Sequence, residues 1–300
     1  MTKDAGTADY GGMKPAPTSR LSTSQPSTSL HAPGVNYHAT SERIHYADLS
    51  LAVREAADTA LGSPVVEAAP PVTSGFTNAY AGGVQLRDGR QAFLKASGPE
   101  FPFPVLSLGR EAQVLEALGE QIPAVPMIGA ATSGDGGRVL ALDWVEGHLP
   151  GLPWTQDEIG LVRAACERVA EVPSSALAAL TPGHVVDNLL IGRRAGEVSD
   201  RAYVLDWNWV TLGPAWCDWV SVIPAMQAQG HDLGELLDST PLSRSADPHA
   251  LDVWLAVLAV YMLVCCEDEP PLGATMALRH HQRYYARVFL DSLATHRGWL

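Results

Sequence analysis

An asparagine and an aspartate, each beside a short apolar run, are two residues in the sequence whose types suggest a chemical role. Asn188 ends a polar loop and is followed by the apolar residues 189–191, whereas Asp206 directly follows the apolar run 202–205. Such runs read as buried strands, and functional groups gather in the loops at strand ends. Amide and carboxylate oxygens suit Mg²⁺, which is often shared with substrate phosphates. The alternative is a hairpin with two ordinary polar end residues.

A third candidate is Lys95, because lysine is rare in this chain. Lysine occurs only at Lys3, Lys14 and Lys95, and arginine supplies the rest of the 20 basic residues. An ammonium is a compact point charge that a guanidinium does not replace. Lys95 is therefore a candidate for a position that requires an ammonium, with chance as the alternative.

Composition limits the class of protein. Three hundred residues, 46% of them hydrophobic, suit one bilobal domain or two small ones with a sizeable core. A net charge of −13 argues against nucleic acid or an anionic membrane surface as the main partner. The four cysteines show no CxxC spacing, and the N-terminus lacks a signal-peptide apolar segment. We therefore expect a cytoplasmic protein.

The chain divides into three parts by composition. Residues 1–42 are rich in small and polar residues and predict a disordered tail. Residues 43–147 predict a small β-rich lobe, in which Asp48 caps a helix that runs to Leu61 and Gly62 ends it. A second helix is expected over 108–118. Five strands are expected near residues 65–66, 80–86, 91–96, 125–131 and 138–145.

Residues 148–300 predict a helical lobe. Thr155 and Glu158 have the spacing of a capping box that opens a helix to about residue 172. Further helices are expected over residues 218–229, 233–237, 250–267 and 273–296. The apolar run 253–266 has 14 residues, which predicts a buried helix rather than a membrane span. The fold class predicted is α+β and bilobal.

This order of features resembles the aminoglycoside phosphotransferase family, a kinase-like group that acts on small molecules. The resemblance covers about residues 45 to 297, and its most specific part is Leu205-Asp206-Trp207 followed by Gly213-Pro214 and, after three residues, Asp218. It implies a protein-kinase-like fold, with ATP and Mg²⁺ as cofactors and a small-molecule hydroxyl as phosphoryl acceptor.

The resemblance also implies roles for individual residues. Lys95 resembles the lysine that contacts nucleotide phosphates, and Glu111 the helix glutamate that holds it. Asn188 and Asp206 resemble the metal ligands, and Asp218 the aspartate that braces the catalytic loop. The alternatives are a surface Lys95–Glu111 ion pair and a simple helix N-cap at Asp218.

Nucleotide-binding positions follow from the same resemblance. The hinge along which adenine would lie corresponds to residues 143–146, with Asp143 and Val145 as the contacts. Gly75 lies in the polar turn between the first two strands, where it is a weak candidate for a phosphate-binding loop. An ordinary hairpin turn is its alternative.

The catalytic loop departs from the family pattern, which has His-x-Asp and then four residues before the asparagine. Counting back from Asn188 places Gly183 at the aspartate and Thr181 at the histidine. His184 or Asp187 would have to act in its place. Loss of a general base typically costs about 10²–10⁴-fold in rate, while positioning and charge remain. The sequence thus leaves two functions: an ATP-dependent phosphotransferase, impaired or using His184, or a catalytically inactive kinase-like nucleotide- or ligand-binding protein. A degraded copy without function is the third alternative.

Overall fold

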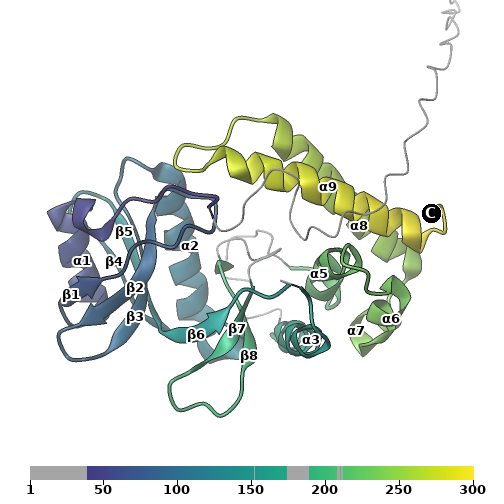
Figure 1. The fold of residues 1–300 in the computed structure, drawn as a ribbon, viewed down its shortest axis with the longest axis horizontal. Coiled ribbons are helices and arrows are strands. Elements are labelled where there is room, and N and C mark those ends of the chain that lie inside the picture. The colour runs from purple at the N-terminus through teal and green to yellow at the C-terminus, as the bar shows by residue number, and fades with distance from the viewer. Residues whose placement is uncertain (1–38, 152, 174–188, 208–209, 211) are drawn as a thin grey trace, which may run out of the picture.

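The structure is a computed structural model that describes residues 39–151, 153–173, 189–207, 210 and 212–300. A small lobe dominated by a β-sheet lies beside a larger helical lobe, and a helical hairpin lies across the top of both (Figure 1). The predicted α+β, bilobal fold class is confirmed.

The small lobe is built on one five-stranded antiparallel sheet. Its strands are β1 (Val65–Ala68), β2 (Tyr80–Leu86), β3 (Gln91–Ser97), β4 (Met127–Thr132) and β5 (Arg138–Asp143), in the order β1-β2-β3-β5-β4. Because side chains alternate along a strand, β3 buries Ala92, Leu94 and Ala96 on one face and places Lys95 on the other. Lys95 is therefore carried by the central strand.

Two helices accompany this sheet, α1 (Leu51–Leu61) and α2 (Pro102–Leu118). The predicted cap at Asp48 is wrong: Asp48 ends a short 3₁₀ turn, and the Ser50 hydroxyl accepts the capping hydrogen bond from the Val53 N–H. The second helix begins at Pro102 rather than at residue 108. Proline is tolerated in a first helical turn because the N–H it lacks would have no partner there.

A second sheet of three strands joins the two lobes. It contains β6 (Val145–His148), β7 (Leu189–Arg194) and β8 (Arg201–Val204), all antiparallel. The strand predicted to end at residue 145 is therefore two strands, because β5 ends at Asp143 and β6 pairs with β7. The Val204 N–H donates to the Pro123 carbonyl oxygen at 2.8 Å, so the end of β8 is held against the small lobe.

The helical lobe contains α3 (Gln156–Ala170), α5 (Cys217–Gln227), α6 (Leu233–Asp238), α7 (Pro241–Arg244), α8 (Pro248–Glu267) and α9 (Met276–His296). The capping box at Thr155 and Glu158 is present in both directions. The helices predicted from the apolar spacing are all found, with slightly different ends. Trp219, Ile223 and Met226 of α5 are fully buried at the centre of this lobe.

Helix α8 begins two residues earlier than predicted, at Pro248, and is more exposed than the buried helix that the sequence predicted. Within the described part of the chain, it is the one helix long and apolar enough to cross a membrane by length and composition alone. One face packs in the core through Leu251, Leu255 and Leu258. The prediction of a buried helix holds for that face only, since another carries exposed apolar side chains at Val253, Val257, Val260 and Val264.

The connection between α8 and α9 reaches the small lobe. It lies along the loop between β1 and β2 (residues 69–79, the β1–β2 loop), where the Asn78 N–H donates to the Gly273 carbonyl oxygen at 2.9 Å. The Thr275 N–H donates to the Phe76 carbonyl oxygen, also at 2.9 Å. The helical lobe therefore contacts the β1–β2 loop directly, as the position of the hairpin in Figure 1 also shows.

The segment before α1 packs on the same loop. Thr40 and Ser41 are buried, and the Thr40 hydroxyl donates to the Gly75 carbonyl oxygen at 2.6 Å. The Thr275 hydroxyl in turn donates to the Thr40 carbonyl oxygen. The sequence placed residues 39–42 in the tail because they are small and polar, but they are part of the folded lobe; residues 1–38 lie outside the described residues.

Two glycines set the close pairing of β6 with β7. Gly147 and Gly192 are opposite one another, and a Cβ added at Gly147 would lie 2.2 Å from the Ile191 carbonyl oxygen. We expect Gly147→Ala to lower the free energy of unfolding by about 1–3 kcal/mol, because the backbone must shift to accept the methyl group.

Urea unfolding measures this change, with Gly134→Ala as the matched control. Gly134 lies in the β4–β5 turn, where an added Cβ would meet nothing within 4 Å. The control is expected to change stability by less than about 0.5 kcal/mol. Equal losses in the two variants would contradict the close approach.

Candidate functional site

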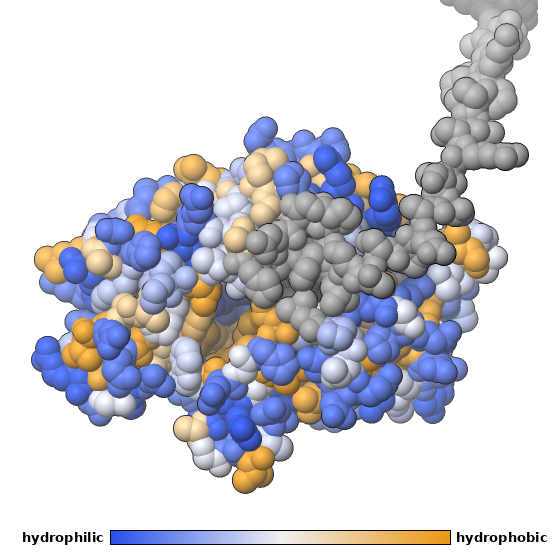
Figure 2. All heavy atoms as spheres, in the orientation of Figure 1, coloured by the Kyte–Doolittle hydropathy of each residue, from blue (hydrophilic) through white to orange (hydrophobic). Residues whose placement is uncertain are grey.

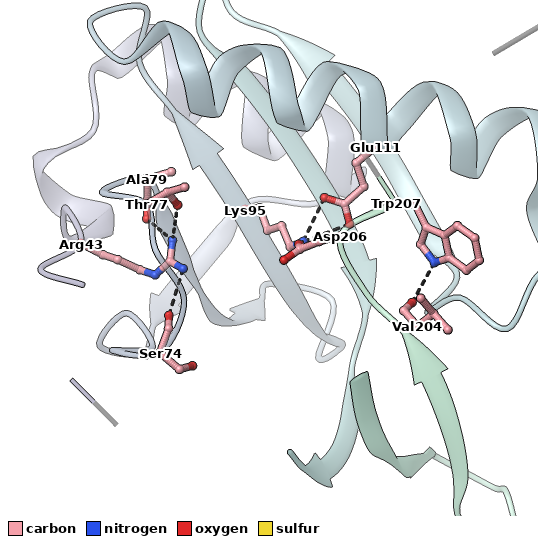
Figure 3. A network of polar contacts seen from close by, with 9 residues as sticks. All are labelled: Arg43, Ser74, Thr77, Ala79, Lys95, Glu111, Val204, Asp206 and Trp207. Atoms are coloured by element: carbon pink, nitrogen blue, oxygen red, sulfur yellow. Dashed lines mark hydrogen bonds and ion pairs between the residues drawn. The ribbon is translucent and has the colours of Figure 1, made fainter. Parts of the chain in front are cut away.

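The candidate site is centred on the Lys95 ammonium. Its Nζ donates to both carboxylate oxygens of Glu111, at 3.0 and 2.9 Å, and forms an ion pair with the Asp206 carboxylate (Figure 3). The side chains of Lys95 and Glu111 are only 15% and 3% exposed. The alternative of a surface ion pair is therefore excluded by burial.

Glu111 reaches the lysine because it occupies the inward face of α2. Leu108, Leu115 and Leu118 are buried on the same helix, at spacings of three or four residues around Glu111. A carboxylate on an apolar face loses its hydration, which is costly unless a cation replaces it. The bidentate contact with Lys95 supplies that compensation and fixes the position of the ammonium.

Asp206 reaches the lysine from the end of β8. Its φ is 53°, and among the described residues no other non-glycine residue has a positive φ. Aspartate tolerates this left-handed conformation better than most residues, and such outliers cluster at functional sites. The following residue, Trp207, is buried and donates from Nε1 to the Val204 carbonyl oxygen at 2.8 Å, which closes the turn.

The charges in this cluster stabilise one another. Burial by itself would lower the pKa of Lys95, but Asp206 and Glu111 outweigh burial, and the pKa is raised. Burial likewise opposes ionisation of Asp206, yet the Lys95 ammonium outweighs it and holds the pKa of that carboxyl below its usual range. At neutral pH the site therefore contains an ammonium and an ionised carboxylate from opposite lobes.

Asp206 has the chemistry of a magnesium ligand. Its side chain is 43% exposed, so a cation can reach its oxygens. The described residues contain no cluster of three or more His, Cys, Asp or Glu that could hold a metal ion. One carboxylate fits a Mg²⁺ held between few protein ligands and substrate phosphates. Asn188, the other predicted ligand, lies outside the described residues.

The hinge positions Asp143 and Val145 lie where β5 passes into β6. The Asp143 carboxylate is 2.5 Å from Arg194 Nη2, and Val145 pairs with Arg194 in the second sheet. Between them Trp144 packs on β2, since a Cβ added at Gly83 would lie 2.8 Å from its ring. The space-filling view shows a hollow with apolar residues at its edge between the two lobes (Figure 2).

Gly75 lies in the β1–β2 loop with a φ of 90°. A Cβ there would lie 2.5 Å from Arg43 Nη2, so the loop wraps around that guanidinium. Arg43 was not predicted as a site residue. It belongs to no short motif, and its contacts are more than 30 residues away in the chain.

Asp218 lies in the first turn of α5. The N-cap of that helix is Trp216, so the alternative of Asp218 as the N-cap is wrong. Burial raises the pKa of Asp218 to about 6. The catalytic-loop positions Thr181, Gly183, His184 and Asp187 lie outside the described residues, so their predicted roles stay predictions.

No protein-family model matches the sequence, and no curated protein matches it. Among solved structures, the chain is similar to the maize sucrose-induced receptor kinase 1 kinase domain bound to AMP-PNP. The identity is 16% and the TM-score 0.32, over 80% of this chain and 95% of that one. It is also similar to a candidate fructosamine-3-kinase from Thermobifida fusca YX-ER1, at 16% identity and a TM-score of 0.30, over 83% and 89% of the chains. At these TM-scores the likeness carries no argument, and the α+β, bilobal fold class rests on the elements described above.

The buried Asp218 carboxyl predicts a dependence of stability on pH. A raised pKa means that the folded protein holds this proton more tightly than the unfolded chain does. Stability should therefore fall as the pH rises from about 4 to about 6, by at most about 3 kcal/mol. Asp218→Asn removes the charge, so the variant should be more stable than the wild type at about pH 7.5 and similar at about pH 4.

Urea unfolding at both pH values measures this effect. Asp200→Asn serves as the control, because Asp200 has a side chain that is 50% exposed and a 3.7 Å contact with Arg193. A variant that is less stable than the wild type at neutral pH would show that the ionised carboxylate has a stabilising partner.

Proposed function

We propose that the chain is an ATP-dependent phosphotransferase that acts on a hydroxyl of a small molecule, like the aminoglycoside phosphotransferase family. One observation carries this proposal: a buried ammonium from the small lobe lies between a helix carboxylate and a carboxylate from the other lobe. Phosphoryl transfer depends mainly on positioning and charge of this kind.

Lys95 would bind the phosphates of the nucleotide. Its raised pKa keeps it positively charged, and Glu111 holds its position from α2. Because the ammonium contacts two carboxylates, phosphate oxygens can take the place of Asp206 while Glu111 remains bound. Glu111 is thus a positioning residue in this proposal.

Asp206 would hold Mg²⁺, with Asn188 as the second expected ligand. When bound, the metal neutralises charge that develops on the transferred phosphoryl group. The lowered pKa of Asp206 keeps its carboxylate ionised and able to bind a cation. Adenine is expected along residues 143–146, where β5 passes into β6 and the ring of Trp144 packs on β2.

The acceptor hydroxyl would lose its proton to His184 or Asp187, since glycine occupies position 183. That glycine also favours the second candidate function, a catalytically inactive kinase-like protein that binds a nucleotide or another ligand. Both candidates require the Lys95 cluster, but only the first requires turnover. Neither nucleic acid nor a membrane is an expected partner, and the expected location is the cytoplasm.

Asp206→Asn tests turnover. Asparagine tolerates the left-handed backbone at this position, so the variant removes the charge without forcing a new conformation. We expect the rate of ADP formation from MgATP, with an aminoglycoside or choline as acceptor, to fall by about 100-fold or more. Asp200→Asn changes an exposed aspartate at the other end of β8 and should leave the rate unchanged. A background rate that Asp206→Asn does not alter would remove the enzyme proposal.

A second prediction concerns nucleotide binding by Lys95. Removing the lysine alone would leave Glu111 buried without a cation, so we compare Lys95→Met/Glu111→Gln with Glu111→Gln. Loss of charge-assisted hydrogen bonds should weaken MgATP binding by about 10- to 100-fold in the double variant, relative to the single one. Isothermal titration calorimetry measures both affinities. Wild-type protein that binds MgATP without turnover would support the inactive binder. No MgATP binding by wild-type protein would contradict the phosphotransferase and leave only a binder of another ligand.

A further inference from the structure

Arg43 is a partly buried cation that interacts electrostatically with Asp206 of the candidate site. It lies in the segment before α1, and its guanidinium donates to three groups of the β1–β2 loop: the Thr77 hydroxyl at 2.9 Å, the Ala79 carbonyl oxygen at 2.9 Å and the Ser74 carbonyl oxygen at 3.0 Å. All three acceptors are neutral. Within the described residues, no carboxylate forms an ion pair with Arg43.

The guanidinium is also incompletely hydrogen-bonded. Arginine carries five N–H donors, and the loop accepts from three of them. The Nε is buried and has no partner among the described residues. A buried charge without a counter-ion costs free energy, and burial accordingly lowers the pKa of Arg43. Arg43 therefore has capacity for an anion that the described residues do not supply.

The position of Arg43 relative to Lys95 and Asp206 indicates where that anion would bind. Figure 3 shows the Arg43 side chain extending from the segment before α1 into the β1–β2 loop, with Lys95 and Asp206 beyond its guanidinium in this view. The electrostatic interaction between Arg43 and Asp206 is favourable, since each shifts the pKa of the other toward the charged form. Asp206 is too far from Arg43 for an ion pair and is already bound by Lys95.

We propose that Arg43 is a second phosphate-binding cation, which acts with Lys95 on the terminal phosphates of a bound nucleoside triphosphate. The inference rests on the proposed function, because it assumes that a nucleotide occupies the hollow between the lobes. In this arrangement Arg43 has two tasks. Three N–H groups hold the β1–β2 loop in shape, and the remaining positive charge attracts phosphate oxygens on the side of Lys95.

The test compares Arg43→Met with Arg90→Met. Arg90 is in the same lobe, also donates to a backbone carbonyl, that of Leu61, and lies in the β2–β3 hairpin. Arg43→Gln is a second variant that keeps N–H donors for the loop but removes the charge, in case Arg43→Met does not fold. Calorimetry measures the affinities for MgATP, MgADP and adenosine, and circular dichroism checks that each variant is folded.

We expect both Arg43 variants to bind MgATP about 10- to 100-fold more weakly than wild-type protein, with a smaller loss for MgADP and none for adenosine. Arg90→Met should match the wild type for all three ligands. Equal losses for MgATP and adenosine would show that Arg43 only shapes the loop, and an unchanged MgATP affinity would also overturn the proposal. If wild-type protein binds no nucleotide, the proposed function itself fails, which is a different result.

Discussion

The structure depends on one requirement, which is that a buried ammonium must be neutralised. Lys95 leaves water when the small lobe folds, and two carboxylates from different elements replace its hydration. Glu111 comes from a helix of the same lobe, whereas Asp206 comes from a strand end of the second sheet. The same electrostatic demand therefore fixes the packing of α2 on the sheet and the position of β8 across the boundary between lobes.

The second sheet brings Asp206 into contact with Lys95. β6 continues from the small lobe, β8 leads into Asp206, and β7 pairs with both. The close approach of Gly147 and Gly192 keeps these strands together, while the hydrogen bond from Val204 to Pro123 holds β8 against the small lobe. The left-handed turn at Asp206 then directs its carboxylate toward Lys95. The close glycine pair, the pairing of the three strands and the left-handed backbone at Asp206 thus together set the position of the Asp206 carboxylate.

Local sequence signals predicted much of the fold. The spans of β2 and β3 follow from apolar runs on either side of the Asp88-Gly89 turn, and the start of α3 follows from the capping box at Thr155. The grouping of Lys95 with Glu111 and Asp206 came from resemblance to a family, since spacing alone does not join residues 95 and 206. Arg43 could not be predicted, because its contacts depend on how the segment before α1 lies on the β1–β2 loop. The separate β6 was missed for the same reason, since its partner β7 is remote in the chain.

The contact between the α8–α9 connection and the β1–β2 loop has a mechanical consequence. The lobes are joined covalently where β5 passes into β6, and a second time, non-covalently, where residues 273–275 pair with residues 76–78. The Lys95–Asp206 ion pair and the Val204–Pro123 hydrogen bond cross the same boundary. Twisting of one lobe against the other therefore requires the backbone pairing at residues 76–78 to break in addition to these contacts.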